Sequence, residues 1–320
     1  MKYQITAEEK GMRLDKFLVG KLSTQTRSQI QKMVKEGGVL VNLKKPTPHH
    51  FLKENDVIEL SENLSSGSKK ISATTIKKTK KTLTSPKTLE PKIIFEDKNL
   101  LVINKPVGIL VHARDEQLLD QEPTIVHWLL KKYPTIKKIG DNPILRPGIV
   151  HRLDKEASGV MVVAKTSAAF DFLKNQFKNR EVKKEYLVWV YGQLSKNWDT
   201  ISFPIGRSRE EGRMAARPIS TTKEEIQPGK EAVTEYEVLQ TEPHKTLVKV
   251  MPKTGRTHQI RVHFFALNHP LIGDPLYQSK SFKTIPSERL LLHAHKLTFK
   301  NLEGEEQTFT APIPKKFSPI

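Results

Sequence analysis

The chain has 320 residues, of which 54 are Lys or Arg and 35 are Asp or Glu, so its formal net charge is +19. A positive charge of this size attracts polyanions and favours a nucleic-acid partner over a small metabolite. Cysteine is absent, which excludes a disulfide framework, a thiolate zinc site and a cysteine nucleophile.

The first residues, MKYQITAEEK, contain no apolar signal-peptide core, and no apolar run of the chain is long enough to span a bilayer. We therefore expect a cytoplasmic protein without a membrane segment. The length is sufficient for one large and one small domain, each with its own core.

Residues 1–60 show the patterns of a small α/β module. The segment MRLDKFLVGKL predicts a helix, because four apolar residues fall on one face: Leu14, Phe17, Leu18 and Leu22. TRSQIQKMVKEGG predicts a second helix that two glycines end, and VLVN and DVIEL predict short strands. Basic residues decorate the two helices, and for any one of them a solvated surface is the ordinary interpretation.

Residues 61–90 are rich in Ser, Thr and Lys and contain few apolar residues. Such a segment cannot bury enough surface to order itself. We expect a flexible basic linker whose paired lysines are able to touch phosphates.

Residues 91–320 predict an α+β domain with a large, mixed, mostly antiparallel sheet and flanking helices. IIFEDKNLLVINKP predicts two strands around a turn. TIVHWLLKKY and SAAFDFLKNQFKN predict helices. Further strands are predicted at KKEYLVWVYG, EAVTEYEVLQ, KTLVKVMP, RTHQIRVHFFA and AHKLTFK.

The segment GIVHRLDKEASGVMVVAK, residues 148–165, places charged residues just before a strand. GVMVVAK predicts a strand buried on both faces, which makes residues 151–158 the loop that feeds it. Arg152 and Lys155 favour the ionised form of Asp154, which makes this side chain a better nucleophile than acid. From this segment alone, an Asp that only caps a turn is an equally good interpretation.

Two further segments carry candidate functional residues. If residues 256–266 form a strand, alternation puts Arg261 on a polar face, where a rigid guanidinium can pair with a carboxylate. An Arg exposed on a sheet surface is the alternative. KKEYLVWVYGQL puts Tyr186 at the start of a strand, either as core or as a platform on which a base stacks.

These segments resemble a known family. HRLDKEASGVMVVAK, KKEYLVWVYG and KTGRTHQIRVHFFALNHPLIGDPLY resemble the RluA family of pseudouridine synthases, and INKPVGILVH resembles its N-terminal motif. The resemblance spans residues 91–300 and is strongest to the branch of ribosomal large-subunit synthase D. RLDKFL, TRSQIQKMVKEGGVLVN and ENDVIEL resemble an S4 RNA-binding domain. One departure is that Glu156 and Ala157 stand where the family usually has Asp and Thr.

The resemblance implies that uridine in RNA is isomerised to pseudouridine, without cofactor or metal. Asp154 would act at C1′, at C6 or on the 2′ proton, and the sequence leaves these routes open. Arg261 would form the ion pair with Asp154, with Arg256 as second choice. Tyr186 would stack on the uracil and assist proton transfer at C5.

The resemblance also implies how RNA is held. The target nucleotide must be extruded from its stack. Arg152 would fill the vacated space, and His151 lies at the base-flipping motif. Lys105 and Arg256 are further expected contacts of the catalytic domain, and Arg13, Arg27 and Lys32 are those of the S4-like domain. We expect ribosomal large-subunit RNA or a pre-ribosomal particle as partner, transfer RNA as the alternative, and a monomer without an obligatory protein partner.

Three rival hypotheses are compatible with parts of the sequence. A metal site would use the histidines, for example His293 and His295, but no thiolate or zincin-like helix supports it. A non-catalytic RNA-binding or ribosome-assembly protein would have no need of Asp154, Tyr186 and Arg261 together. A hydrolase acting on nucleic acid would normally need a second acid near Asp154, where Glu156 is the only one close in sequence.

Overall fold

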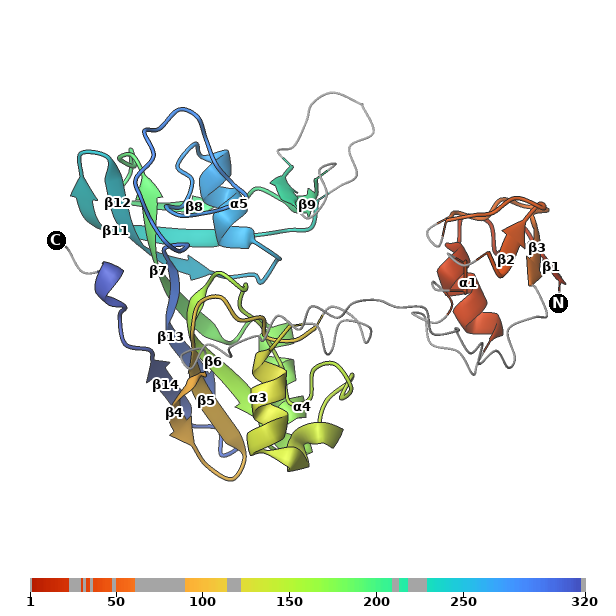
Figure 1. Cartoon of the computed structure of the whole chain (residues 1–320), viewed down its shortest axis with the longest axis horizontal. Coiled ribbons are helices and arrows are strands. Elements are labelled where there is room, and N and C mark those ends of the chain that lie inside the picture. The colour runs from red at the N-terminus through yellow and green to blue at the C-terminus, as the bar shows by residue number, and fades with distance from the viewer. Residues whose placement is uncertain are drawn as a thin grey trace, which may run out of the picture. The chain divides into compact units, whose positions relative to one another are not determined.

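The computed structural model describes residues 2–22, 30, 33–34, 37–47, 50–60, 90–113, 122–208, 213–217 and 229–317. The chain divides into two compact units, Met1–Thr82 and Leu83–Ile320 (Figure 1). The expected linker lies outside the described residues except for Glu90. Within the described ranges, no helix is both long and apolar enough to cross a membrane.

The first unit is a three-stranded antiparallel sheet with a helix packed on it. The strand order is β1 (Lys2–Gln4), β3 (Val57–Leu60), β2 (Val39–Val41). The predicted first helix is α1 (Leu14–Lys21). Of the predicted second helix, the structure describes only three residues, all helical, of which two are fully buried against α1: Ile30 and Val34.

Three basic residues of this unit were expected to bind RNA, and the structure describes one of them. Arg13 is the N-cap residue of α1, and its guanidinium makes hydrogen bonds of 3.1 and 2.8 Å to the buried Asp15 carboxylate. Arg27 and Lys32 lie outside the described residues. The structure therefore places one of these three cations, at the start of α1.

The second unit is built on one nine-stranded sheet, which confirms the predicted α+β class (Figure 1). The strand order begins with β4 (Lys92–Glu96), β5 (Leu100–Lys105), β6 (Ser158–Ala164) and β13 (Leu292–Lys300). It continues with β7 (Lys183–Tyr191), β12 (Lys245–Pro252), β11 (Thr234–Glu242) and β8 (Trp198–Ile201). β14 (Glu306–Thr310) also pairs with β13. Neighbouring strands are antiparallel except for β6 and β13.

Helices cover the two halves of this sheet separately. α3 (Ile125–Lys132) and α4 (Ser167–Lys178) lie beside the β5–β6 half, and each begins at a threonine cap, Thr124 and Thr166 (Figure 1). α5 (Gln259–Ala266) packs against β11 and β12. A separate two-stranded ribbon is formed by β9 (Ile205–Arg207) and β10 (Met214–Ala216). Short 3₁₀ turns occupy Pro134–Lys138 and Lys315–Phe317.

The prediction of a strand at residues 256–266 was wrong, because this segment forms α5. Residues 259–264 are all buried, polar and apolar alike, so this part of the helix has no solvent-exposed polar face to give it an amphipathic period. Its β-branched and aromatic residues match a strand pattern instead. The helix ends where Asn268, at φ 61°, takes the left-handed conformation, with His269 N donating to Phe264 O.

The two halves of the sheet join at the parallel pairing of β6 with β13, where Gly159 faces Ala294. Gly159 has φ 123°, and a Cβ there would collide with the backbone carbonyl of Ala294, so the close approach requires glycine. All seven residues of β6 are buried. The loop with Asp154 therefore enters the sheet at this join, on a rigid support.

Candidate active site

A cleft of about 490 Å³ lies where the loop before β6, the start of β7 and the N-terminus of α5 meet. It brings together six of the residues expected at the site, which are His151, Arg152, Asp154, Tyr186, Arg256 and Arg261. Asp154 is the only carboxylate among the described residues that line it. The cations that line it are Arg152, Lys178, Arg180, Lys184, Lys253, Arg256 and Arg261. The cleft thus offers one acid in a surface that suits a polyanion.

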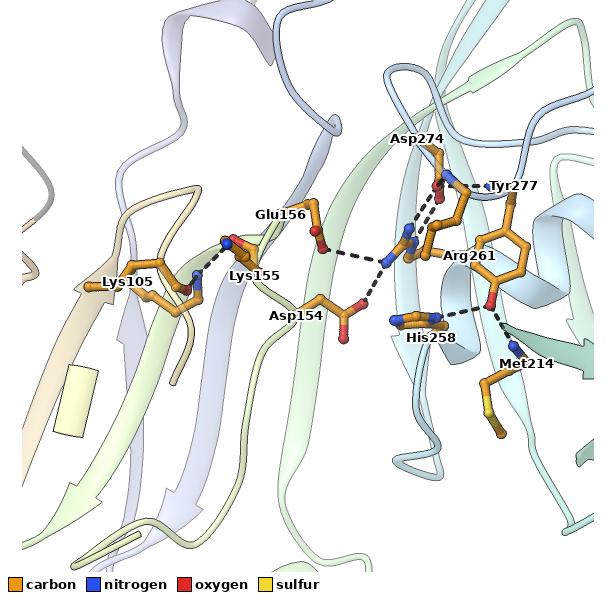
Figure 2. Close-up of polar contacts among 11 residues, drawn as sticks. Lys105, Asp154, Lys155, Glu156, Met214, His258, Arg261, Asp274 and Tyr277 are labelled. Atoms are coloured by element: carbon orange, nitrogen blue, oxygen red, sulfur yellow. Dashed lines mark hydrogen bonds and ion pairs between the residues drawn. The ribbon is translucent and has the colours of Figure 1, made fainter. Parts of the chain in front are cut away.

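Asp154 and Arg261 form the ion pair expected from the sequence. Arg261 Nη1 lies 3.4 Å from Asp154 Oδ2 (Figure 2). The Arg261 side chain is fully buried, whereas that of Asp154 is 19% exposed, so the carboxylate remains accessible from the cleft. Arg256, the second choice, instead donates from Nε to the backbone carbonyl of Glu231 at 2.9 Å.

Asp274 holds Arg261 more firmly than Asp154 does. Its two carboxylate oxygens accept from Arg261 Nε and Nη2 at 2.7 Å each, and one of them also accepts the backbone N–H groups of Leu276 and Tyr277. Burial acts to lower the pKa of Arg261, but the bonds and charge of Asp274 outweigh it and raise this pKa above its ordinary value. Arg261 is therefore a fixed cation.

Glu156 is the third carboxylate around this guanidinium, with Oε2 at 3.7 Å from Nη1 (Figure 2). It is one of the two family departures seen in the sequence; Ala157, the other, is buried in the core. Asp274 was not predicted, although it lies within the quoted segment PLIGDPLY. Because Asp274 is buried and its oxygens are already bonded, it is not available as the second acid of a hydrolase.

Tyr186 lies at the start of β7 and lines the same cleft. Burial raises the pKa of its phenol well above the ordinary value, and the negative charge of Asp154 adds to this effect. The phenol therefore stays protonated and keeps both an aromatic face and a hydroxyl donor.

His151 is fixed by the protein rather than free in the cleft. Its ring stacks on Phe177 with centroids 4.6 Å apart, and its Nε2 accepts the backbone N–H of Val162 at 3.1 Å. Burial, with a smaller effect of the Lys184 charge, lowers the pKa of His151 to about 3. The neutral imidazole thus ties the loop that carries Asp154 to β6. Arg152, next to it, is exposed, lines the cleft and makes no ion pair with the described residues.

Lys105 does not reach the cleft, contrary to the expectation that it contacts RNA. Its ammonium is fully buried and donates to the backbone carbonyls of Pro106, Ile109 and Lys155 at 2.9, 2.9 and 3.3 Å (Figure 2). Burial lowers the pKa of Lys105 to about 7. Through these hydrogen bonds the Lys105 side chain links the INKPVGILVH segment to Lys155, the residue after Asp154.

The two histidines considered for a metal site, His293 and His295, form hydrogen bonds with other protein groups. His293 Nδ1 lies 2.9 Å from Ser158 Oγ, and His295 Nδ1 lies 3.1 Å from the carbonyl of Ala311. In the part of the chain that the structure describes, no three side chains of His, Cys, Asp or Glu are grouped to hold a metal ion.

Comparisons with known proteins identify the family of the chain. The sequence profile of RNA pseudouridylate synthase matches residues 99–266, and that of the S4 domain matches residues 12–58. The chain is 35% identical to an uncharacterised RNA pseudouridine synthase, YlyB, of Bacillus subtilis over 98% of this chain and 94% of the relative. It is 33% identical to ribosomal large subunit pseudouridine synthase D of Borreliella burgdorferi over 99% and 91%.

A solved structure gives the same assignment. Human RNA pseudouridylate synthase domain containing 1 is 29% identical, with a TM-score of 0.56, over 71% of this chain and 84% of that one. The profile covers more than half of the chain, and the relatives match almost all of it. The chain therefore belongs to the RluA-type RNA pseudouridine synthases with an N-terminal S4 domain, and is an isomerase that acts on RNA.

Proposed function

We propose that this synthase converts uridines of large-subunit ribosomal RNA to pseudouridine, and that Asp154 is the group that acts on the nucleoside. The observation that carries the second part is that Asp154 is the single carboxylate among the described residues that line the cleft, where the other charged side chains are Lys and Arg, and that it is paired with Arg261 at 3.4 Å. The first part is supported by relatives whose names include ribosomal large subunit pseudouridine synthase D and C.

The reaction needs few groups. The N1–C1′ bond breaks, the freed uracil turns, C5 bonds to C1′, and the proton on C5 is removed while N1 gains one. No atom enters from outside. Arg261 orients the Asp154 carboxylate through the 3.4 Å ion pair, whichever of its three possible points of attack it uses. The protonated phenol of Tyr186 is suited to stack on the uracil and to assist the proton transfer.

The uridine must leave its stack to reach Asp154, because the carboxylate lies inside the cleft. Arg152 is exposed and makes no ion pair with the described residues. We propose that its side chain occupies the space that the extruded nucleotide leaves. The remaining cations of the cleft then hold the phosphates on either side.

The test is to incubate the protein with ribosomal RNA and with transfer RNA and to map pseudouridines by carbodiimide-stopped reverse transcription. We expect new stops in large-subunit RNA that disappear with Asp154→Asn. The matched control is Asp199→Asn, which removes a surface carboxylate paired with Lys196. Stops only in transfer RNA would overturn the substrate assignment, and stops that persist with Asp154→Asn would overturn the role of Asp154.

A further inference from the structure

His258 occupies an unusual backbone position at the cleft. It precedes the first residue of α5 and has φ 55° and ψ 21°, the left-handed region that a residue with a side chain rarely adopts. Such strain persists only where the surroundings impose it, and it concentrates at functional sites. The side chain lines the cleft together with Asp154, Tyr186 and Arg261.

A hydrogen-bond relay fixes one nitrogen of the His258 ring. The backbone N–H of Met214 donates to Tyr277 Oη at 2.9 Å, and Tyr277 Oη lies 2.9 Å from His258 Nδ1 (Figure 2). The phenol has one hydrogen to donate, and among the described residues His258 Nδ1 is the acceptor within reach. We assign donation from Tyr277 to Nδ1, which places the imidazole proton on Nε2.

The other ring nitrogen of His258, Nε2, faces Asp154 (Figure 2). In Figure 2, Nδ1 of His258 is turned to Tyr277, and the opposite edge of the ring is turned toward Asp154. The charged groups around the ring are Asp154, Arg261, Asp274 and Glu156. Burial has the largest effect and lowers the pKa of His258, although the three carboxylates act to raise it. Burial and the Arg261 charge thus favour the neutral ring, which directs an N–H into the cleft.

We propose that Nε2–H of His258 donates a hydrogen bond to a carbonyl oxygen of the extruded uracil and stabilises the departing base; this inference rests on the uridine chemistry proposed above. When the N1–C1′ bond breaks, its electron pair stays on the uracil and spreads onto the ring carbonyl oxygens. A fixed donor at such an oxygen binds more strongly as this charge develops, and so accelerates the step.

In this arrangement Tyr277 is a positioning residue. Its hydroxyl does not need to touch the RNA, because it acts by keeping the proton of His258 on Nε2. The contact of the Tyr277 ring with the Arg261 guanidinium, whose Cζ lies 5.2 Å from the ring centroid, holds the phenol in place. The same tyrosine thus touches both the cation that pairs with Asp154 and the histidine opposite it.

The first test is the tautomer itself. Nitrogen-15 spectra of the ¹⁵N-histidine-labelled full-length protein, with the His258 signals identified by their loss in His258→Gln, should show Nε2 protonated and Nδ1 unprotonated. In Tyr277→Phe we expect both tautomers. A proton on Nδ1 in the wild-type protein would overturn the inference, whatever the enzyme's substrate is.

The second test is kinetic. Under single-turnover conditions with ribosomal RNA, His258→Ala should lower the rate about 100-fold, as expected for loss of one donor to a developing negative charge, while RNA affinity changes little. His258→Gln, whose amide reaches the region of Nε2, should recover part of the loss. Tyr277→Phe should move the acid limb of the pH–rate profile to higher pH, because the bond donated to Nδ1 stabilises the neutral ring.

Tyr133→Phe is the matched control, because its hydroxyl bonds to Glu96 away from the cleft, and it should leave the profile unchanged. If His258→Ala retains the wild-type rate while Asp154→Asn is inactive, the inference about His258 fails and the proposed function stands. If the wild-type protein forms no pseudouridine in either RNA, the proposed function fails, and the tautomer spectra still decide the assignment of His258.

Discussion

Arg261 and Asp274 are joined by two hydrogen bonds of 2.7 Å, and this pair determines how Arg261 meets the cleft. With Nε and Nη2 directed at Asp274, the guanidinium presents Nη1 to Asp154 at 3.4 Å. The geometry of the pair that Arg261 forms with Asp154 is thus set by a carboxylate that does not line the cleft.

Asp274→Asn should destabilise the protein and loosen the site. It removes a buried negative charge from a fully buried arginine, for which a loss of about 3–5 kcal/mol in the free energy of unfolding is typical. Urea unfolding measures this. Glu156→Gln is the control, because its carboxylate lies farther from Arg261 and is 36% exposed, so we expect a change below about 1 kcal/mol. Equal effects of the two substitutions would contradict the dominance of Asp274.

Lys105→Met should change how stability depends on pH. The pKa of Lys105 is lowered from 10.5 to about 7 in the folded protein. Between these pH values the unfolded chain binds a proton that the folded chain does not, so stability rises with pH in that window, by up to about 1.4 kcal/mol per pH unit for one group. Below pH 7 both states bind the proton and this contribution to the slope vanishes.

The measurement is urea unfolding of wild type and Lys105→Met from pH 6 to 9. The free energy of unfolding of wild type minus that of Lys105→Met should increase above pH 7. Lys92→Met, at an exposed position of β4, should show the same pH dependence as wild type. Parallel pH curves for wild type and Lys105→Met would show that the buried ammonium does not titrate in this range.

Arg152→Ala should reduce modification of uridines in duplex stems more than of uridines in free loops. Extrusion from a stack costs a few kcal/mol more when the base is paired, and an inserted side chain offsets that cost. Pseudouridine mapping on matched stem and loop RNAs measures the ratio. Arg180→Ala, at a cleft cation already paired with Glu231, should lower both rates alike. The same loss on both RNAs for Arg152→Ala would remove its insertion role.

Deletion of residues 1–60 should weaken RNA binding by at least about tenfold and alter the choice of sites while leaving some chemistry, because two linked RNA-binding units gain affinity from each other. The catalytic unit has its own separate core, so it should still unfold cooperatively. Filter binding at one fixed salt concentration, followed by site mapping, checks this. Unchanged affinity and site choice would make the S4 domain dispensable.

The sequence predicted the strands and helices of the catalytic domain well where their pattern was regular. β6, β7, β11 and β12 have the apolar or alternating residues of strands, and α4 has an apolar stripe. The prediction for α5 failed because the helix is buried on nearly every side. A buried helix lacks the alternation of apolar and polar faces by which a helix is identified in a sequence. Asn268, which ends it, was the available signal.

The residues of the candidate site were also predicted only in part. The motifs located Asp154 and Arg261, and the structure places them in contact. Lys105 was expected to contact RNA, yet three backbone carbonyls hold its ammonium inside the protein, an arrangement unusual for lysine. Asp274 and His258 bond to Arg261 and Tyr277, 13 and 19 residues away in the same motif, and these pairings exist only because the segment folds as α5 followed by a turn, which the predicted strand did not anticipate.

The parallel pairing of β6 with β13 has a consequence for biosynthesis. Because β13 supplies residues 292–300 and closes the sheet beside the loop that carries Asp154, a chain emerging from the ribosome cannot complete this framework until nearly all of it has been made. We therefore expect the enzyme to gain activity only once its synthesis is almost finished, and any truncated product that lacks the last thirty or so residues should be unable to modify a transcript.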